Sequence, residues 1–551
     1  MAYRTWRIGL FIGIALITPL VMILYLASVV VGVVFPAFPV FDGFARILPG
    51  PLVTTGIDTL VAIIRGLNLG RTDTTAKIAE QLMGIGLFIV IGLVASLVYA
   101  SWRRNLKLPR FHISGLVLGL AIGLPITLIA LGLDRGASAS PVLSGAWLIF
   151  AFSLWGMAHS VAAASLDSVA ARTEPILPPA IPAMDSDHRQ IVKVISRREF
   201  LIQLGGISAT VTVVGAGLSA LFNMQSTSPT TGAAAGSTTP IPPQGTPVAT
   251  AGLVPAPGTR PEITPVSEHY RIDIVTGAVP SIDEASYSLV LDGLVETAST
   301  LTLSQIRDLP RQEQYITMSC ISNPIAGDLI STTRWIGVSM QEIVALAKPT
   351  AEATHIKIYG ADGFFEILDM ALIAEDPRLM LTYAWDGMPL PERNGFPLRV
   401  HIPDRYGMKQ PKWITRMEFI SQWEPGYWVV RGWDQEARVR ATSVIDTIAT
   451  NDTFERDGKT FVPVGGIAWS GVRGISKVEV SVDGGNWVEA QLRPAMSDKT
   501  WVIWRYDWEF QPGAHTFAVR CTELDGTPQI VEGAGVRPSG ATGIHSRAAV
   551  L

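Results

Sequence analysis

The feature that most constrains this fold is a series of long apolar runs in the first third of the chain. Each run is nearly free of charged side chains, and together they occupy residues 8–35, 78–100, 113–133 and 142–164. A membrane-spanning helix needs about 20 mostly apolar residues, because it rises about 1.5 Å per residue across roughly 30 Å of hydrocarbon. The sequence therefore predicts an α-helical membrane domain of four spans over residues 1–165.

Two further apolar stretches are predicted to play different roles. Residues 200–222 form a predicted fifth span, within a segment 166–224 that also contains a cytoplasmic loop. Residues 52–69 are apolar but interrupted by Asp58 and Arg65. This pattern predicts an amphipathic helix at the membrane interface and not a crossing.

Positive charges in the short loops predict the orientation in the membrane. Lysine and arginine near span ends resist translocation, so loops rich in them stay in the cytoplasm. These residues precede the first span, fill the loop between the second and third spans, and precede the fifth: Arg4, Arg7, Arg103, Arg104, Lys107, Arg110, Arg189, Lys193, Arg197 and Arg198. With a cytoplasmic N-terminus and five crossings, the chain after about residue 223 is predicted to lie outside the cytoplasm.

The hexapeptide SRREFL at residues 196–201, just before the predicted fifth span, resembles the twin-arginine export signal S/T-R-R-x-F-L. An ordinary positively charged flank is the alternative. The serine, phenylalanine and leucine at matching offsets favour the signal. That pathway carries proteins already folded around a cofactor made in the cytoplasm.

The rest of the chain reads as a linker and two soluble domains. Residues 225–265 are dominated by Ser, Thr, Pro, Gly and Ala, which predicts a disordered, solvated linker. Residues 266–435 mix period-two strands with a helix near 339–348 and predict an α+β domain. Residues 436–540 contain short alternating strands between Gly-, Asp- and Asn-rich turns, which predicts an immunoglobulin-like β-sandwich.

Charge and cysteine content exclude several functions. A formal net charge of −4 gives no basis for binding nucleic acid. The two cysteines, Cys320 and Cys521, are too few for a disulfide framework and too far apart for a zinc cluster. Cys521 falls in a predicted sandwich strand and is expected in the core. Cys320 ends a predicted strand and enters a loop, which is a suitable place for a functional site, although a lone cysteine is more often an inert core residue.

Several separated motifs resemble, in order, the molybdenum domain of sulfite oxidases and plant-type nitrate reductases. They are Tyr270-Arg271, Cys320-x-x-Asn323 with Trp335-x-Gly337-Val338, residues 383–390, Asn394-Gly-Phe-Pro397-Leu-Arg399 and residues 407–413. Residues 464–471, 478–485 and 504–508 are similar to the immunoglobulin-like C-terminal domain of the same family. The resemblance covers residues 268–536 and implies a molybdenum–molybdopterin cofactor.

The resemblance also implies roles for individual residues. Cys320 matches the thiolate that binds molybdenum, and a soft anionic sulfur suits that metal. Arg271 matches an arginine near the metal, where a cation would steer an oxyanion; a surface ion pair is the alternative. The positions implied to bind the cofactor are Tyr270, Arg271, Cys320, Asn323, Arg399, Lys409 and Lys412. Among them the basic side chains would donate charge-assisted hydrogen bonds to the pterin phosphate, the alternative being a solvated basic loop.

Departures from the family pattern indicate a different or broader substrate pocket. Sulfite oxidases carry an arginine shortly after the Cys-x-x-Asn loop, whereas this chain has Pro-Ile-Ala at residues 324–326. Asn394 replaces a histidine, and Asp273 stands where animal enzymes place one. Trp433 takes the place of a catalytic tyrosine late in the domain, and an indole donates one hydrogen bond but cannot ionise as a phenol can.

Together these features predict an extracytoplasmic, membrane-anchored oxidoreductase that performs two-electron oxygen-atom transfer on a small oxyanion or on an S- or N-oxide. The chain has no haem or iron–sulfur cysteine pattern, so a separate cytochrome or quinone is expected as the electron partner. Haem is not indicated, because His159 in the fourth span has no second interior histidine to pair with. The sandwich is compatible with a homodimer.

Two alternatives stay open at this point. One is a sulfoxide reductase in place of a sulfite oxidase. The other is a cofactor-free membrane receptor or adhesion protein with an immunoglobulin-like tip on a flexible stalk. The five spans, the linker and the sandwich would suit such a receptor, but it leaves the ordered motifs around Cys320 unexplained.

Overall fold

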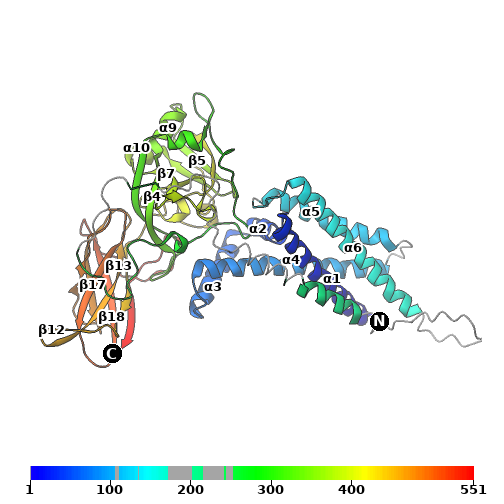
Figure 1. Ribbon diagram of the computed structural model, residues 1–551, viewed down its shortest axis with the longest axis horizontal. Coiled ribbons are helices and arrows are strands. Elements are labelled where there is room, and N and C mark those ends of the chain that lie inside the picture. Colours follow the sequence, from blue (N-terminus) through cyan, green and yellow to red (C-terminus); the bar gives the residue numbers. More distant parts are fainter. Residues whose placement is uncertain are drawn as a thin grey trace, which may run out of the picture. The chain divides into compact units, whose positions relative to one another are not determined.

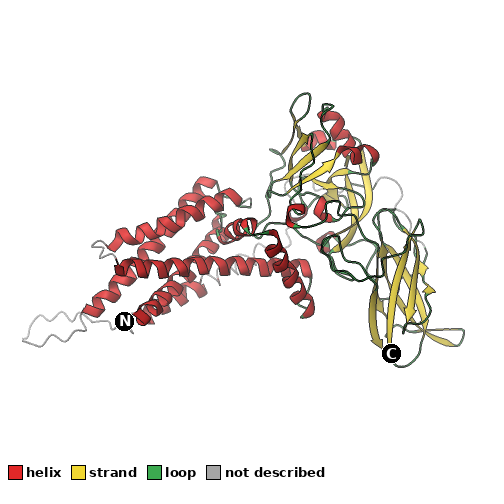
Figure 2. Ribbon diagram, turned by 180° about the vertical axis from the view of Figure 1, so that it is seen from behind, coloured by secondary structure: helices red, strands yellow, loops and turns green. Residues whose placement is uncertain are grey.

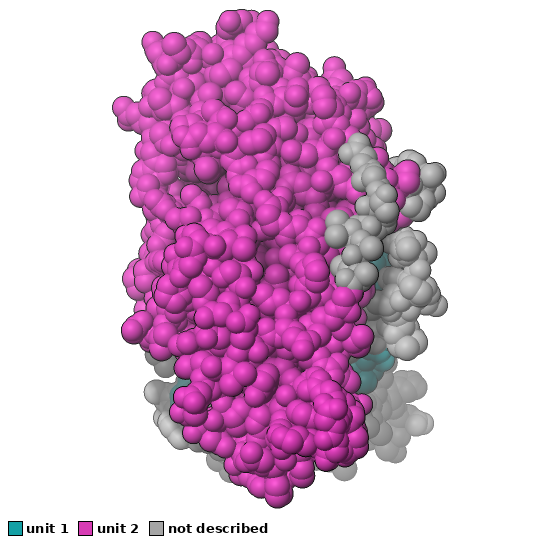
Figure 3. Space-filling view, turned by 90° about the vertical axis from the view of Figure 1, so that its left-hand side faces the viewer, with its two compact units in different colours: residues 1–47, 77–230, 275–281 teal, residues 48–76, 231–274, 282–551 magenta. Residues whose placement is uncertain are grey.

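The computed structural model describes residues 2–105, 111–134, 136–171, 202–214, 217, 241–243 and 252–551. It divides into two compact units, shown in different colours in Figure 3. The helical unit comprises residues 1–47, 77–230 and 275–281. The strand-rich unit comprises residues 48–76, 231–274 and 282–551.

The helical unit contains the predicted membrane spans. Four helices are long and apolar enough to cross a bilayer, which confirms the four spans predicted before residue 170: Gly9–Val31, Thr72–Trp102, Ile113–Leu133 and Pro141–Ser165. They lie in α1 (Ala2–Val31), α4 (Thr72–Asn105), α5 (Phe111–Leu133) and α6 (Pro141–Ala171), and α2 (Ala37–Ile47) follows α1. Figure 2 shows helices joined by loops, and no strand, in the described part of residues 1–47 and 77–230.

Small residues explain how two of these helices pack. In α5 and α6, a side chain on Gly115 would collide with the carbonyl of Gly156, so the glycines allow the two backbones to touch. His159 of α6 is buried, with Nε2 bonded to Ser96 at 2.8 Å and Nδ1 to the Trp155 carbonyl at 3.0 Å. Both ring nitrogens therefore have protein partners.

The predicted fifth span is described only in part. A 13-residue apolar helix covers Ile202–Val214, which is shorter than a crossing requires. The twin-arginine-like motif at residues 196–201 lies outside the described residues, as does most of the predicted linker 225–265. The end of that linker is bound to the strand-rich unit, because Arg260 pairs with Asp446 at 2.6 Å.

The amphipathic helix predicted over residues 52–69 is α3 (Gly50–Gly66). It belongs to the strand-rich unit, in which it buries Thr54 and Ile64. Its Asp58 accepts a hydrogen bond from Arg537 Nε at 2.6 Å. The loop after α3 leads directly into α4, whose first turn still belongs to the strand-rich unit.

The α+β domain is built from two sheets. One has the strand order β2-β1-β10-β5-β6, in which β1 and β10 run parallel; the other has the antiparallel order β3-β4-β7-β8, with β9 on β7. The strands are β1 (Ser288–Gly293), β2 (Ser299–Thr302), β3 (Arg311–Ser319), β4 (Ile330–Ser339), β5 (His355–Gly360), β6 (Phe365–Asp369), β7 (Met380–Trp385), β8 (Met388–Pro389), β9 (Arg399–His401) and β10 (Ile414–Ile420). Both sheets share one core with the helices, which are α8 (Leu303–Arg307), α9 (Met340–Ala347) and α10 (Met370–Glu375) (Figure 1).

The C-terminal domain consists of two antiparallel sheets. Their orders are β11-β13-β17-β16, with β12 on β13, and β15-β14-β18-β19. The strands are β11 (Thr442–Ile448), β12 (Phe454–Arg456), β13 (Lys459–Trp469), β14 (Ile475–Val482), β15 (Val488–Glu489), β16 (Gln491–Leu492), β17 (Val502–Glu509), β18 (Ala514–Glu523) and β19 (His545–Val550). Side chains of both sheets, including Trp504 and Phe517, fill one core, as predicted for a sandwich. Cys521 is buried in that core, also as predicted.

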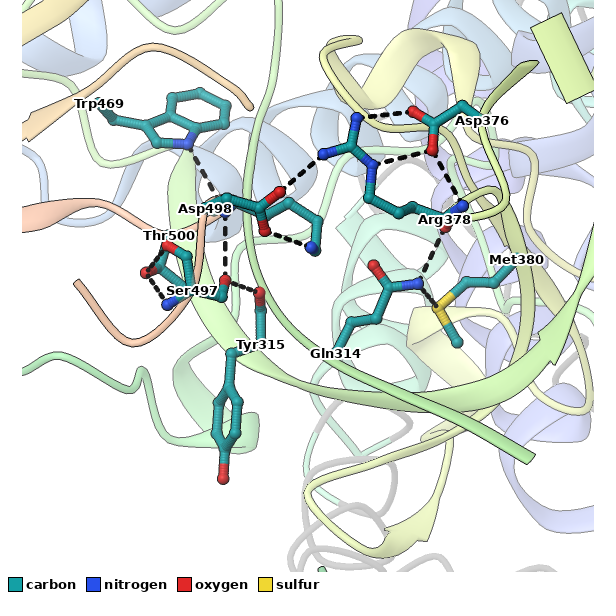
Figure 4. A network of polar contacts seen from close by, with 10 residues as sticks. Gln314, Tyr315, Asp376, Arg378, Met380, Trp469, Ser497, Asp498 and Thr500 are labelled. Atoms are coloured by element: carbon teal, nitrogen blue, oxygen red, sulfur yellow. Dashed lines mark hydrogen bonds and ion pairs between the residues drawn. The ribbon is translucent and has the colours of Figure 1, made fainter. Parts of the chain in front are cut away.

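A polar network joins the two domains of the strand-rich unit (Figure 4). Arg378 donates to Asp498 at 2.7 Å, and Ser497 Oγ donates to the Tyr315 carbonyl at 2.6 Å. On the same strand, the Thr317 amide donates to the Lys499 carbonyl at 3.0 Å. The loop at residues 497–501 therefore braces β3, the strand that leads to Cys320.

Candidate functional site

Cys320 is the first residue after β3 and begins a closed loop. Its amide donates to the Leu329 carbonyl at 2.9 Å, and the Leu329 amide donates to Asn323 Oδ1 at 3.0 Å. These bonds close the loop over residues 320–329 and fix the direction of the cysteine side chain. Cys320 is buried, and burial raises the pKa of its thiol, while a hydrogen bond with Ser322 lowers it. Asn323, predicted to bind the cofactor, closes the loop by accepting this hydrogen bond with its side-chain oxygen.

Tyr270 lies against Cys320 in the same buried cluster. Its amide donates to Ser331 Oγ at 3.1 Å, which ties it to β4. Burial and then the Cys320 charge raise the pKa of the phenol, and Arg399 lowers it, so the ring lies within range of both groups. A Cβ on Gly407 would lie 2.8 Å from the Tyr270 hydroxyl, so this close approach requires glycine.

Arg399, the first residue of β9, is a buried cation without a carboxylate partner among the described residues. It donates to the Asn394 carbonyl at 3.0 Å and to Met318 Sδ at 3.4 Å. The rings of Trp335 and Trp385 lie 4.8 and 4.9 Å from its guanidinium carbon. Burial lowers the pKa of Arg399 to about 10. A charge buried in this way is costly unless an anion compensates it, so the surroundings of Arg399 fit an anionic ligand.

Lys412 and Arg271 share one buried carboxylate. Asp273 Oδ2 accepts from Arg271 Nε at 2.5 Å and from Lys412 Nζ at 3.3 Å, and the Asp273 side chain is fully buried. Burial lowers the pKa of Lys412 to about 8, against the opposing effect of Asp273. The ion pair considered for Arg271 therefore exists, but its partner is a buried acid of the site and not a surface residue.

Lys409 differs from Arg399 and Lys412, the other two predicted phosphate ligands, because it forms an ion pair with a carboxylate of its own. Its buried ammonium donates to Glu366 Oε1 at 2.5 Å, and the Glu366 side chain is also buried. Burial raises the pKa of Glu366, and Lys409 lowers it. The pair neutralises itself, so Arg399 and Lys412 remain as the cations with charge to offer a ligand.

Breaking the Lys409–Glu366 pair is expected to destabilise the protein strongly. A Glu366→Gln variant leaves the Lys409 charge buried and unpaired, which costs about 3–5 kcal/mol of unfolding free energy. Denaturant unfolding of the full chain measures this loss. The matched control is Glu424→Gln, which breaks the exposed pair of Glu424 with Lys357 and should cost no more than about 1 kcal/mol. Equal losses in the two variants would contradict the assignment of Lys409 to a structural pair.

Trp433, predicted to occupy a catalytic position, lies in a different buried cluster from Cys320. Its ring stacks with Arg537, whose guanidinium carbon lies 4.3 Å from the ring centroid. The same cluster contains Tyr406, a phenol within electrostatic range of the cysteine. Burial raises the pKa of Tyr406 to about 12, and the Cys320 charge contributes in the same direction. Sequence reasoning missed Tyr406, although it directly precedes the Gly407–Lys412 motif.

The described residues also fit a buried polar ring system. Several polar atoms of this site are buried and have no hydrogen-bond partner among the described residues, among them His269 Nε2, Asn394 Oδ1 and Arg399 Nε. The His269 ring lies 4.2 Å from that of Trp385, and burial lowers the pKa of His269 to about 3, so it is neutral. Buried polar atoms are normally satisfied. A pterin, which offers both donors and acceptors together with a phosphate, meets these requirements.

Comparison with known proteins agrees with this geometry. Residues 276–428 match the family described as oxidoreductase molybdopterin binding domain, and residues 433–530 match the Mo-co oxidoreductase dimerisation domain. The matched region contains Cys320, Arg399, Lys409 and Lys412, and it begins shortly after Arg271. Residues 276–428 and 433–530 therefore form the two domains that occur in molybdopterin-dependent oxidoreductases.

Several named proteins are similar to parts of this chain. The mitochondrial sulfite oxidases of Homo sapiens and Macaca fascicularis are 28% identical over 323 and 319 residues, which cover 50% of this chain and 57% of each relative. Over this half of its length the chain is similar to the sulfite oxidase family. A protein of Azospira oryzae named "Putative protein-methionine-sulfoxide reductase subunit YedZ1" is 30% identical over 176 residues, covering 32% of this chain and 63% of that protein. The chain thus spans less than two thirds of the length of these relatives.

One solved structure is similar over a comparable region. The sulfane dehydrogenase SoxCD of Paracoccus pantotrophus is 21% identical, and the match covers 52% of this chain and 81% of that one, with a TM-score of 0.46.

Proposed function

We propose that this protein is a membrane-anchored oxidoreductase that transfers an oxygen atom to or from a small sulfur or nitrogen oxy-compound in a two-electron reaction. The observation that carries the proposal is the buried Arg399 cation, which lies beside Tyr270 and Cys320 without a carboxylate partner among the described residues. A protein that retains such a charge needs an anionic ligand to compensate it. The molybdopterin cofactor of the family is such a ligand.

Each residue has a defined task in this proposal. Cys320 supplies the thiolate ligand, held by the 320–329 loop. Arg399 and Lys412 bind the anionic and polar parts of the pterin, and Tyr270 closes the space between Cys320 and Arg399. When bound, the molybdenum–pterin group supplies the two-electron redox chemistry and exchanges the oxygen atom. Arg271, oriented by Asp273, attracts and binds the substrate oxyanion.

Reduction of a sulfoxide is the second candidate. The match to a protein named as a methionine-sulfoxide reductase subunit favours it, and so do the departures at Asn394 and residues 324–326, which remove side chains that sulfite oxidases carry. In that direction the substrate gives up its oxygen and the electrons flow toward the site. The same cofactor and the same cysteine serve both directions.

The location and the partners complete the proposal. We infer that the four apolar helices anchor the chain in lipid. The lysines and arginines in the short loops support a strand-rich unit that lies outside the cytoplasm. The electron partner is a separate cytochrome or quinone that meets the protein at the membrane. The dimerisation domain at residues 433–530 supports a homodimer.

Elemental analysis of the full-length protein tests the proposal. The chain is purified in detergent from a host that makes molybdopterin and, as a matched control, from one that cannot. We expect close to one molybdenum per chain from the first host and none from the second. Loaded protein is then assayed for sulfite oxidation with ferricyanide, and for reduction of methionine sulfoxide and trimethylamine N-oxide with reduced viologen. Well-folded protein without metal from the competent host would refute the proposal.

A further inference from the structure

The segment that joins the first two candidate spans contacts two parts of the candidate site. One is the loop over residues 320–329, and the other is the segment around Tyr270. The Thr72 amide, at the start of α4, donates to Asp328 Oδ2 at 2.8 Å. Arg71 Nη2 donates to the Glu268 carbonyl at 2.8 Å. The Arg271 amide donates to Asp73 Oδ2 at 3.0 Å. All these residues belong to the strand-rich unit.

The residues that make these contacts lie close in sequence to Tyr270, to Arg271 and to the residue that bonds the Cys320 amide. Glu268 ends a short 3-10 helix, Val266–Glu268, and Tyr270 and Arg271 follow after His269. Asp328 precedes Leu329, whose carbonyl accepts the hydrogen bond of the Cys320 amide. The tripeptide Arg71-Thr72-Asp73 therefore holds the backbone on two sides of the site, within one or two residues of Tyr270 and of the partner of Cys320.

Asp73 is the centre of this arrangement. Its side chain is 7% exposed and accepts five hydrogen bonds. Two come from Arg71, through Nε and Nη2 at 3.2 Å each, two from the amide and hydroxyl of Thr74 at 2.8 and 3.2 Å, and one from the Arg271 amide at 3.0 Å. A carboxylate that accepts this many bonds is fixed in direction, so it fixes the Arg271 backbone in turn.

The charges around Asp73 suit a small anion. Burial lowers the pKa of Arg393, and the charges of Arg271 and Arg71 lower it further, so these three arginines lie within interaction range of one another. The Arg71 side chain is 41% exposed, which leaves it partly open to solvent. Asp73 offsets part of the mutual repulsion of the arginines and keeps the cluster together.

We propose that the Arg71-Thr72-Asp73 segment is a positioning element of the active site. Asp73 is the positioning residue that holds the backbone of Arg271, so that the side chain, oriented by Asp273, can bind an anionic substrate. The connection between two membrane helices thus sets the affinity for the anion as well as anchoring the chain. The expected effect on KM rests on the proposed function. The effect of Asp73 on the Arg271 backbone does not depend on that function.

Amide hydrogen exchange on the full-length protein in detergent tests the structural part. In Asp73→Ala, the Arg271 amide loses its acceptor, and we expect peptides covering residues 268–273 to exchange at least about tenfold faster. Asp73→Asn keeps an acceptor oxygen and should give a smaller increase. Asp58→Ala is the matched control, because it breaks another contact of the same connection, with Arg537, away from Arg271. Equal acceleration in Asp73→Ala and Asp58→Ala would overturn the proposal.

Steady-state kinetics with sulfite as the probe anion and ferricyanide as acceptor test the consequence. Asp73→Ala should raise KM at least about tenfold and change kcat less than about threefold, because it weakens binding of the anion and leaves the metal ligand in place. Asp73→Asn should recover part of the KM, and Asp58→Ala should match the parent.

The outcomes separate this inference from the proposed function. If the parent binds no molybdenum, the proposed function fails, and hydrogen exchange alone decides the role of Asp73. If the parent is loaded and Asp73→Ala keeps the parent's KM, the positioning role is refuted while the function stands. If the loaded parent does not oxidise sulfite, the comparison is made with the Ki of sulfite as an inhibitor of methionine sulfoxide reduction by reduced viologen, where an unchanged Ki again refutes the role.

Discussion

Replacing Cys320 with serine is expected to remove the bound metal or to leave it inactive, with turnover reduced by more than about a hundredfold. Loss of a group that only orients a metal ligand already costs about 10–100-fold, and the ligand itself should matter more. A serine hydroxyl stays protonated at neutral pH and is a poor substitute for a soft thiolate. Molybdenum content and turnover of the full-length variant, measured side by side with the parent, check this result.

The second cysteine provides the control. Cys521 is buried in the sandwich, where its thiol donates to Gln529 Oε1 at 3.2 Å. Cys521→Ser makes the same chemical change in another buried setting of the same unit. It should leave the molybdenum content unchanged. A Cys320→Ser protein that keeps both its metal and its turnover would exclude Cys320 as the ligand.

The sequence predicted the features that depend on local pattern. The four spans follow from hydropathy over about 20 residues, which no distant contact can alter. The strand end at Cys320 and the helix near residues 339–348 also follow from short-range periodicity, and the structure has β3 ending at Ser319 and α9 at Met340–Ala347. The resemblance added the identity of the cofactor, because its motifs are ordered along the chain.

Long-range pairing was not predictable in the same way. Lys409 bonds Glu366 across 43 positions of sequence, and the Arg271 amide bonds Asp73 across 198. No periodic sequence pattern links the members of either pair. The catalytic role of Trp433, which came from the resemblance, stays a prediction, whereas the packing of its ring against Arg537 could not be predicted from the sequence. The one available signal for Asp73 was the polar Arg-Thr-Asp sequence at residues 71–73 between two apolar helices.

Replacing Arg399 with methionine is expected to have opposite effects on folding and on cofactor binding. Methionine has a similar length and can fill the space between Trp335 and Trp385, where sulfur–aromatic contacts are favourable. Exchanging a buried charge for a well-packed apolar side chain is often neutral or stabilising by about 1–4 kcal/mol. Without the cofactor, the variant should therefore unfold at the same or a higher denaturant concentration than the parent.

The same substitution removes the cation that an anionic cofactor needs. In a host that makes molybdopterin, Arg399→Met should retain less than about a tenth of the parent's molybdenum, since a lost charge-assisted hydrogen bond costs about 1.5–3 kcal/mol and tenfold in binding corresponds to 1.4 kcal/mol. Arg416→Met is the control, because Arg416 pairs with Asp292 outside the Cys320 cluster. A variant that loses stability and keeps its metal would show that Arg399 supports the fold and not the cofactor. The combination of unchanged or higher stability with lost metal has one physical cause, a charge retained at a cost to folding because it binds an anion.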